Sequence, residues 1–363
     1  MTLPDRLLMG PGPSNPYPEV VAAFSQPLLG HLDPEFLRVL DETCSRLRTV
    51  FRTTNPLTLP ISGTGSAGME ACFVNLVEPG DTVIIGVNGV FGERMCEVAR
   101  RSGAAVVRVE AEWGQPIDPQ RLLDAHTQTP QARLVAVVHA ETSTGVENSI
   151  EPLRVLQDTD TLLLVDAVTS LAGVPLDVDG WGIDACYSGT QKCLGVPPGL
   201  SPVTFSPRAV ERISTRTAPV QSWYLDLGLI GDYVGTARKY HHTAPTGMIV
   251  ALHAGLGAVL DEGVDAVWSR HRTVGTTLQS ALVDRGFTLI APDEARLPQL
   301  TSVRVPVGLD EGALRERLLE DFSIEVGGGL GAFAGVAWRI GLMGHTARAR
   351  NVAAFLGALD TLL

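Results

Sequence analysis

The chain has 363 residues, and its 28 basic against 40 acidic side chains give a formal net charge of -12. This charge has the wrong sign for a protein that binds nucleic acid, and the apolar runs are too short and too interrupted to cross a membrane. The stretch from Met1 to Pro13 lacks a charged-then-apolar signal pattern, so we expect a cytoplasmic protein of one large and one smaller lobe.

The five cysteines are an odd number, and no two of them have the C-x-x-C spacing. A disulfide framework or a zinc site is therefore not expected. Cys193 could act as a nucleophile, but no nearby histidine is positioned to activate it. We interpret it as a packed thiol.

From about residue 55 onward, short β-branched runs alternate with helix-like stretches, which is typical of repeated β-α units around a mostly parallel sheet. A later strand is expected just after Pro197-Pro198-Gly199, at residues 202–205. The runs that predict buried strands before it span residues 82–86, 105–109, 134–138 and 162–165.

After Gly247 the pattern changes to a helical stretch from 248 to about 261, whose regularly spaced apolar side chains predict a helix that bridges two lobes. Strand-like runs at 301–306 and 337–341 and a helix-like run at 311–320 follow it. These runs predict a second, smaller α/β lobe.

The expected organisation is therefore α/β in three parts. An N-terminal segment, 1–15, would contribute to the active site or to a dimer. A large domain, 16–260, would carry the mostly parallel central sheet, and a smaller C-terminal α/β domain would span 261–363.

A glycine cluster from Ser62 to Gly68 follows a short strand-like run and opens a helix predicted to extend to about Glu78. The amides of Gly65 and Ser66 and the hydroxyls of Thr64 and Ser66 would point outward at the positive end of the helix dipole. The start of this helix is a candidate anion site, although a tight turn without a ligand would have the same pattern.

The same cluster has the spacing Gly63-x-Gly65-x-x-Gly68, which is the fingerprint of dinucleotide binding. An NAD-dependent oxidoreductase is therefore an alternative of a different class. Such a site normally has an acidic residue at the end of the next strand, where this chain has Val87-Asn88-Gly89. The fingerprint alone is a weak indication.

Asp166 closes the apolar run 162–165, and Lys192 follows it in a segment of small and apolar residues. A carboxylate at the carboxyl edge of the sheet lies where α/β proteins bind ligands, and burial favours the neutral, nucleophilic form of a lysine. Pyridoxal phosphate needs both groups, an acid on its pyridine nitrogen and an amine on its aldehyde. A helix-capping Asp166 and a surface Lys192 are the alternatives.

Two further side chains follow predicted strands. Phe91, in a glycine-bounded loop, could stack on a flat ring, and Thr142 offers a hydroxyl to a ring oxygen. An ordinary core phenylalanine and a threonine that satisfies a turn are the alternatives.

Two polar features lie further along the chain. Tyr240 and Thr243 flank two histidines that point in different directions, so a phosphate contact through the tyrosine and threonine is favoured over a metal site. Arg339 lies in an apolar strand and needs an anionic partner, either a substrate carboxylate or an internal salt bridge.

Taken in order, these features resemble the class V, fold-type I pyridoxal phosphate aminotransferases, and within them the alanine–glyoxylate and serine–glyoxylate group. The match runs along nearly the whole chain. Its distinctive pieces are Gly10-Pro11-Gly12-Pro13-Ser14-Asn15, Asn55-Pro56-Leu57-Thr58-Leu59, Ser62-Gly63-Thr64-Gly65, Leu76-Val77-Glu78-Pro79-Gly80-Asp81, Ser143-Thr144-Gly145-Val146, Val165-Asp166, Ser188-Gly189-Thr190-Gln191-Lys192, Pro197-Pro198-Gly199, Tyr240-His241-His242-Thr243 and Trp338-Arg339-Ile340-Gly341.

The resemblance implies pyridoxal 5'-phosphate as the cofactor, with Lys192 as its aldimine partner and Asp166 on its pyridine nitrogen. It also implies that Thr142 bonds the ring hydroxyl and that Phe91 stacks on the ring, where family members often carry a larger aromatic. The phosphate would be held by Thr64, Gly65, Ser66 and Gln191, with Tyr240 and Thr243 from the second subunit of a homodimer.

The resemblance implies further that Arg339 binds the substrate carboxylate beside the backbone of Gly12. The expected reaction is a ping-pong transamination between a small amino acid, alanine or serine, and glyoxylate or pyruvate. Pyridoxamine–pyruvate and ureidoglycine–glyoxylate aminotransferases are the alternatives within the family. Ser66 stands where some relatives have histidine, and Phe91 replaces tryptophan, so the phosphate contacts and the substrate are where this chain departs from the family pattern.

Overall fold

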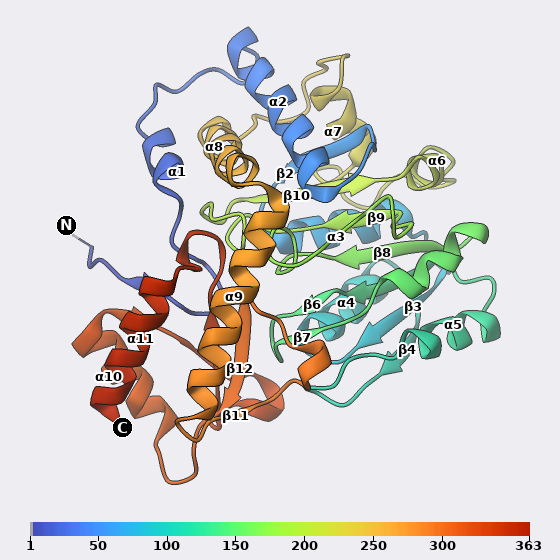
Figure 1. Cartoon of the computed structure of the whole chain (residues 1–363). Helices are drawn as coiled ribbons and strands as arrows, with labels where there is room; N and C mark the ends of the chain where they lie inside the picture. Colours follow the sequence, from blue (N-terminus) through green and yellow to red (C-terminus); the bar gives the residue numbers. More distant parts are fainter. Residues whose placement is uncertain (1–2) are drawn as a thin grey trace.

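Seven strands form the central sheet, in the order β2-β10-β9-β8-β5-β3-β4. The computed structural model describes residues 3–363 and has this sheet in the larger of two units (Figure 1). β10 is antiparallel to both of its neighbours, and the other strands are parallel to one another. The strands are β2 (Leu57–Ser62), β3 (Thr82–Val87), β4 (Ala105–Glu110), β5 (Leu134–Val138), β8 (Leu162–Asp166), β9 (Ala185–Tyr187) and β10 (Leu200–Phe205).

The five predicted strands of the large unit are confirmed as β3, β4, β5, β8 and β10. Every residue of β5, β8 and β10 is buried, which explains why β5 and residues 162–165 of β8 are continuous apolar runs rather than alternating ones. β9 was not predicted, because three residues are too few to give a periodic pattern.

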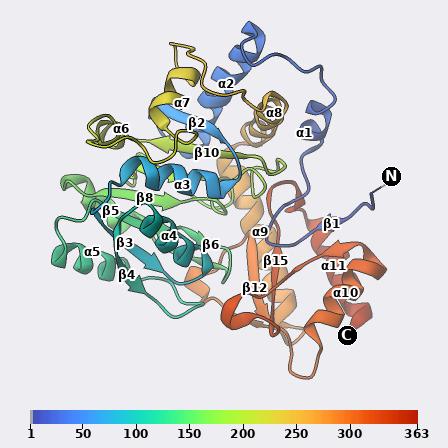
Figure 2. The same cartoon turned by 180° about the vertical axis from the view of Figure 1, so that it is seen from behind.

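Helices between the strands pack on this sheet (Figures 1 and 2). α2 begins at Pro34, where Asp33 accepts a hydrogen bond from the amide of Glu35, and ends at Phe51, before the C-cap Arg52, whose φ of 54° is left-handed. The helical elements are α1 (Pro18–Ala23), α2 (Pro34–Phe51), α3 (Gly65–Leu76), α4 (Val90–Arg101), α5 (Pro119–Gln128), η1 (Glu151–Asp158), α6 (Pro207–Ser214) and α7 (Leu227–Val234).

Two consecutive helices, α8 (Thr246–Glu262) and α9 (Val264–Val283), lead from the large unit to the smaller one (Figure 1). α8 confirms the predicted bridging helix, and it packs against α1 and α2. Within residues 3–363 no single helix is long and apolar enough to span a membrane; α8 and α9 meet that test only as a pair, bent by 82°.

The smaller unit has a four-stranded antiparallel sheet in the order β11-β12-β15-β14 and its own hydrophobic core around Trp338 and Phe355. The predicted strands and helix are confirmed here, and β12 stops before Pro306 because proline cannot donate to the ladder. The elements are β11 (Thr288–Leu289), β12 (Leu300–Arg304), α10 (Glu311–Phe322), β13 (Ile324–Glu325), β14 (Gly327–Gly328), β15 (Ala337–Gly341) and α11 (Ala349–Leu362).

The N-terminal segment lies against this smaller unit, where β1 (Leu7–Leu8) pairs in parallel with β13 (Figure 2). Within α9, Val267 belongs to the core of the large unit and Val274 to the core of the smaller one. α9 therefore packs against the core of the large unit near its start and against the core of the smaller unit further along. The domain boundary expected between residues 260 and 261 stays a prediction.

Candidate active site

Lys192 lies in the connection between β9 and β10, and only 7% of it is exposed. Its Nζ donates a hydrogen bond to the backbone carbonyl of Pro11. Burial, followed by the positive charge of Arg339, lowers the pKa of Lys192 to about 8. The alternative of a solvated surface lysine is wrong, and the amine is neutral over a larger part of the physiological range than an exposed lysine would be.

Asp166 is the last residue of β8 and is 2% exposed. Its Oδ1 accepts a hydrogen bond from the amide of Val168 at 2.8 Å, and its Oδ2 accepts one from the hydroxyl of Tyr187 at 2.7 Å. Burial raises the pKa of Asp166 to about 6, while these hydrogen bonds and the charge of Lys192 oppose the rise. Only one oxygen of the Asp166 carboxylate bonds a backbone amide that follows it, as a helix cap would. The residues after Asp166 form turns rather than a helix, so Asp166 does not cap a helix.

The predicted anion site is the N-terminus of α3. Thr64 is the N-cap in extended conformation; its carbonyl accepts from the amide of Ala67, but its side chain makes no capping hydrogen bond to the first-turn amides. Gly65 is closely packed, since a Cβ there would lie 3.0 Å from Cγ2 of Val168. α3 ends at Leu76, two residues before the predicted end, because Val77 is extended ahead of Pro79.

The strand order argues against the NAD-dependent alternative. A dinucleotide site is built on a β-α-β unit whose two parallel strands share one crevice. Here β2 pairs only with the antiparallel β10, and β3 lies five places away along the sheet. Close packing explains the glycine at position 68 instead, because a Cβ there would lie 2.1 Å from Oγ of Ser201. The glycine spacing therefore reflects close helix-sheet contact and the anion-binding turn.

A cavity of about 180 Å³ brings most of the predicted residues together. Seven of them line it: Thr64, Gly65, Ser66, Phe91, Asp166, Gln191 and Lys192. The same wall includes four residues that were not predicted: Met69, Arg94, Val168 and Tyr187.

Phe91 and Arg94 lie in the first turns of α4, which corrects the expectation that Phe91 is in a loop. The guanidinium of Arg94 is 4.9 Å from the centre of the Phe91 ring, and its Nη1 is 3.4 Å from Oγ of Ser66. Their spacing of three residues would have indicated a shared helix face if the start of α4 had been recognised.

Tyr187 was missed because its position depends on strand pairing. It lies on β9, directly opposite Asp166 in the parallel register, and it is fully buried. Burial and the charge of Asp166 raise the pKa of the Tyr187 hydroxyl well above its ordinary value. The hydroxyl therefore stays protonated and donates to the carboxylate.

Three other predicted residues, Gly12, Arg339 and Thr142, do not line the cavity. Gly12 has a φ of 107°, and a Cβ there would lie 2.8 Å from Nζ of Lys192. Arg339 donates from Nε to the carbonyl of Gly328 at 2.9 Å and from Nη1 to the carbonyl of Thr142 at 3.5 Å. The Thr142 hydroxyl is itself bonded to the hydroxyl of Thr169.

Arg339 forms no ion pair with any side chain in residues 3–363, so the internal salt bridge expected as an alternative is not observed there. Burial lowers the pKa of this guanidinium, and the negative charge of Glu141 partly offsets the effect. A half-buried cation without a carboxylate partner is suited to bind a small anion.

Tyr240 and Thr243 are exposed and do not line the cavity of their own chain. Tyr240 is 59% exposed, and its ring centre lies 5.4 Å from that of His31. Their predicted phosphate contact stays a prediction.

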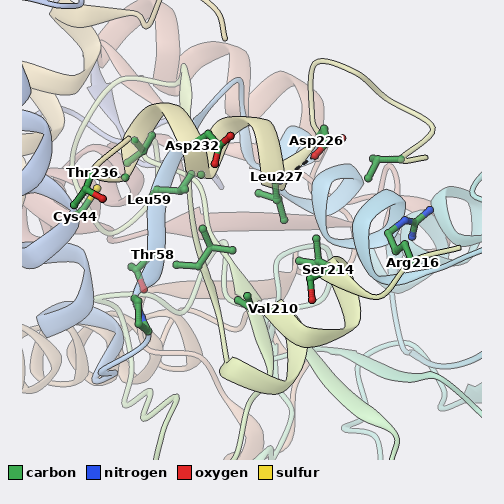
Figure 3. Close-up of a pocket in the computed structure, with 18 of the residues that line it drawn as sticks. Cys44, Thr58, Leu59, Val210, Ser214, Arg216, Asp226, Leu227, Asp232 and Thr236 are labelled. Atoms are coloured by element: carbon green, nitrogen blue, oxygen red, sulfur yellow. Dashed lines mark hydrogen bonds between the residues drawn. The ribbon is translucent and has the colours of Figure 1, made fainter. Parts of the chain in front are cut away.

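The largest cavity described in the structure, about 810 Å³, lies elsewhere (Figure 3). Its wall comes from α2, β2, α6 and α7, and includes Cys44, Leu59, Val210 and Leu227. None of the predicted site residues lines it. Size alone therefore does not identify the candidate site.

The residues of the smaller cavity fit pyridoxal phosphate. The buried amine of Lys192 suits its aldehyde, the buried carboxylate of Asp166 suits its pyridine nitrogen, and the free amides at the start of α3 suit its phosphate. The side-chain Oε1 of Gln191 is buried without a hydrogen-bond partner from residues 3–363, which leaves this acceptor available to a donor group of a ligand.

Comparisons with known proteins agree with this chemistry. The sequence matches the family described as aminotransferase class-V over residues 16–349. A crystal structure of alanine–glyoxylate aminotransferase from Nostoc sp. is 46% identical, with a TM-score of 0.97 over 100% of this chain and 96% of that chain. The (S)-ureidoglycine–glyoxylate transaminase of Bacillus subtilis is 37% identical over 99% of this chain and 91% of its own length.

A third relative is more distant. The crystal structure of pyridoxamine-pyruvate aminotransferase from Mesorhizobium loti is 29% identical, with a TM-score of 0.93 over 99% of this chain and 93% of that chain. The matched family depends on pyridoxal phosphate, which agrees with the buried lysine and carboxylate of the cavity. The chain belongs to the class V aminotransferases.

Proposed function

We propose that this aminotransferase moves the amino group of a small amino acid, alanine or serine, to glyoxylate or pyruvate in a ping-pong reaction. The observation that carries the proposal is the half-buried guanidinium of Arg339. It has no ion-pair partner from residues 3–363, and its charge is close enough to lower the pKa of Lys192. It supplies one bidentate anion site beside the reactive amine, which suits the single carboxylate of such substrates.

Bound pyridoxal phosphate supplies an aldehyde that accepts the amino group and a ring that withdraws electrons from the bond to the α-hydrogen. The neutral Nζ of Lys192 takes the α-proton and later returns it. Asp166 keeps a negative charge beside the ring nitrogen. Arg339 would bind the substrate carboxylate and so orient the α-carbon for this proton transfer.

We also propose a homodimer in which Tyr240 and Thr243 of one subunit contact the phosphate bound by the other. In support, both residues are exposed, and the neighbouring aromatic rings include the exposed Trp223 beside the buried His241 and the half-buried His31 beside Tyr240. Trp223 is 63% exposed, and its ring centre is 4.3 Å from that of His241. Exposed aromatic groups of this kind are typical of an interface with another chain.

The cytoplasm is the proposed compartment. The five cysteines are all free and buried, which is usual for a protein that folds under reducing conditions. Fractionation of the source cells, followed by detection of the protein, tests this assignment.

Ureidoglycine is the second candidate amino donor, because the ureidoglycine–glyoxylate transaminase of B. subtilis matches 99% of this chain. Free pyridoxamine has weaker support, since the pyridoxamine–pyruvate enzyme is only 29% identical and Thr64 to Ser66 are present to hold a phosphate.

The decisive experiment is a screen of purified enzyme with alanine, serine, aspartate, ureidoglycine and pyridoxamine as donors, each against glyoxylate and pyruvate. We expect the largest kcat/KM for alanine or serine with glyoxylate. Borohydride should abolish the visible absorption and leave a reduced adduct on Lys192. Preference for another donor contradicts the substrate proposal, and an adduct on Lys239 contradicts the site.

A further inference from the structure

Glu141 is a fully buried carboxylate that the reaction described above does not use. It is the last residue of β6 (Ala140–Glu141), which forms a hairpin with β7 (Val146–Glu147) just beyond the carboxyl end of β5. Thr142, the predicted contact of the ring hydroxyl, follows it directly. A buried carboxylate is costly, so its hydrogen-bond partners and its position require an explanation.

One oxygen of Glu141 caps the helix that carries Phe91. The N-cap of α4 is Gly89, which makes no side-chain cap, and the amides of Phe91 and Gly92 donate to Oε2 of Glu141 at 3.2 and 3.3 Å. A Cβ on Gly89 would lie 2.5 Å from Cδ of Glu141. The glycine leaves the space, and the carboxylate replaces the missing cap from another element.

The other oxygen is held by Ser143. The amide of Ser143 donates to Oε1 at 3.1 Å, its hydroxyl donates to the same atom, and that hydroxyl accepts a bond from the amide of Val90 at 2.9 Å. Burial raises the pKa of Glu141 to about 7, and the donated hydrogen bonds oppose the rise. Because every partner is a donor, this shell suits the ionised carboxylate.

The negative charge of Glu141 also acts on Arg339. Glu141 forms no ion pair with a side chain in residues 3–363, but its charge acts to raise the pKa of Arg339. Nη1 of that arginine also faces the carbonyl of Thr142, one residue from Glu141. The carboxylate thus bonds to the helix that carries Phe91, and the next residue, Thr142, accepts a hydrogen bond from Arg339 through its carbonyl.

We propose that Glu141 is a positioning residue that fixes Phe91 and Arg339 relative to each other, and so sets the cofactor ring against the substrate carboxylate. The inference rests on the proposed role of Arg339 in binding that carboxylate. Glu141 itself does not line the cavity. Its effect is expected on binding more than on the chemical step.

The test compares Glu141→Gln with Asp184→Asn, a matched control. Asp184 is also a buried carboxylate bonded to an amide, that of Leu163 at 3.0 Å, but it precedes β9 at the opposite edge of the sheet. Glutamine has the shape of glutamate, but it must turn its NH2 toward one pair of donors. For Glu141→Gln we expect the KM values for alanine and glyoxylate and the Kd for added pyridoxal phosphate to rise about tenfold, with kcat changed less.

Asp184→Asn should lower Tm without changing these binding constants. The inference is wrong if Glu141→Gln changes KM and Kd less than twofold, or if both variants change them equally. If Glu141→Gln does not fold, Ser143→Ala removes one donor and keeps the charge; it should raise the same constants severalfold, and unchanged constants overturn the inference. Failure of the substrate proposal is distinguishable, because wild-type enzyme would then use neither alanine nor serine, while the pyridoxal phosphate titration still reports on Phe91.

Discussion

Burial moves the pKa of Lys192 down to about 8 and the pKa of Asp166 up to about 6. The two values approach each other because desolvation disfavours the charged form of both groups. The hydrogen bonds to Asp166 from Val168 and Tyr187 act in the opposite direction and keep its carboxylate available as an anion. A lysine and an aspartate of the same family motif would not have these properties on an exposed loop.

The pKa of Lys192 predicts how fast cofactor-free enzyme takes up pyridoxal phosphate. Only the neutral amine attacks an aldehyde, so the rate should rise with pH and level off above about 8 rather than near 10.5. Absorbance after rapid mixing measures the rate. Arg339→Gln removes a positive charge and should move the midpoint upward; a wild-type midpoint near 10 contradicts the prediction.

Arg339→Ala should lower kcat/KM for the amino donor by about 10- to 100-fold, the equivalent of losing hydrogen bonds between charged groups. Cofactor retention, measured by visible absorbance after dialysis, should change little. Arg304→Ala is the control, since this exposed arginine lies on the neighbouring strand β12. Equal loss of cofactor and activity would mean that Arg339 has a structural role.

At the scale of elements, α3 joins the anion site to the sheet. Its first turn lines the cavity, while Gly68 one turn later contacts the side of the sheet formed by β9 and β10. A Cβ on Gly68 would lie 2.1 Å from Oγ of Ser201 and 3.1 Å from Cβ of Tyr187. α3 can therefore lie this close to the sheet only because residue 68 has no side chain.

Gly68→Ala should destabilise the protein by roughly 1 to 3 kcal/mol, because the buried helix must move away from the sheet. It should also weaken pyridoxal phosphate binding, since the amides of the first turn move with it. Thermal unfolding and cofactor titration measure the two effects. Gly357→Ala is the control: this glycine, within α11, has no atom within 4 Å of the added Cβ, and the change should stabilise by about 0.5 to 1 kcal/mol.

At the scale of the molecule, Lys192 lies where three parts of the chain meet. The N-terminal segment supplies the carbonyl of Pro11, the large unit supplies Asp166, and the smaller unit supplies Arg339. β1 attaches the N-terminal segment to the smaller unit through β13, while Ser14 bonds to the carbonyls of Gln191 and Lys192 in the large unit. The proposed dimer would add a fourth contributor, Tyr240 and Thr243 of a second subunit.

Mixed dimers test that contribution. Lys192→Ala subunits lack the amine, and subunits with Tyr240→Phe and Thr243→Ala lack the proposed phosphate contacts. If these contacts act across the interface, each mixed dimer has one intact site, and random mixing restores about a quarter of the wild-type sites. Activity at limiting pyridoxal phosphate measures them. Activity no higher than the mean of the two separate variants shows that the contacts do not cross the interface.

Local pattern was enough to predict most strands and the two central site residues. The run 162–165 is apolar throughout, so only a buried strand accommodates it, and the polar residue that closes it must lie at an edge of the sheet. Lys192 was identifiable because few buried environments accept an amine unless it has a chemical role. The N-terminus of α3 was identifiable from its glycines for a similar reason.

Contacts between side chains of different elements could not be predicted from local sequence pattern. Arg94 depends on where α4 begins, Tyr187 on the register between β8 and β9, and Glu141 on a helix that lacks its own cap. Each of these contacts joins residues that are far apart in the sequence or whose element boundary carries no local signal.

The sequence by itself determined the α/β class, the lysine and acid that pyridoxal phosphate requires, and membership of a family, because apolar periodicity and reactive side chains are properties of short segments. Only the tertiary structure decided the protonation balance of Lys192 and Asp166, the absence of an ion-pair partner for Arg339 within residues 3–363, and the burial of Glu141. These properties depend on desolvation and on neighbouring charges, which arise when distant segments pack together.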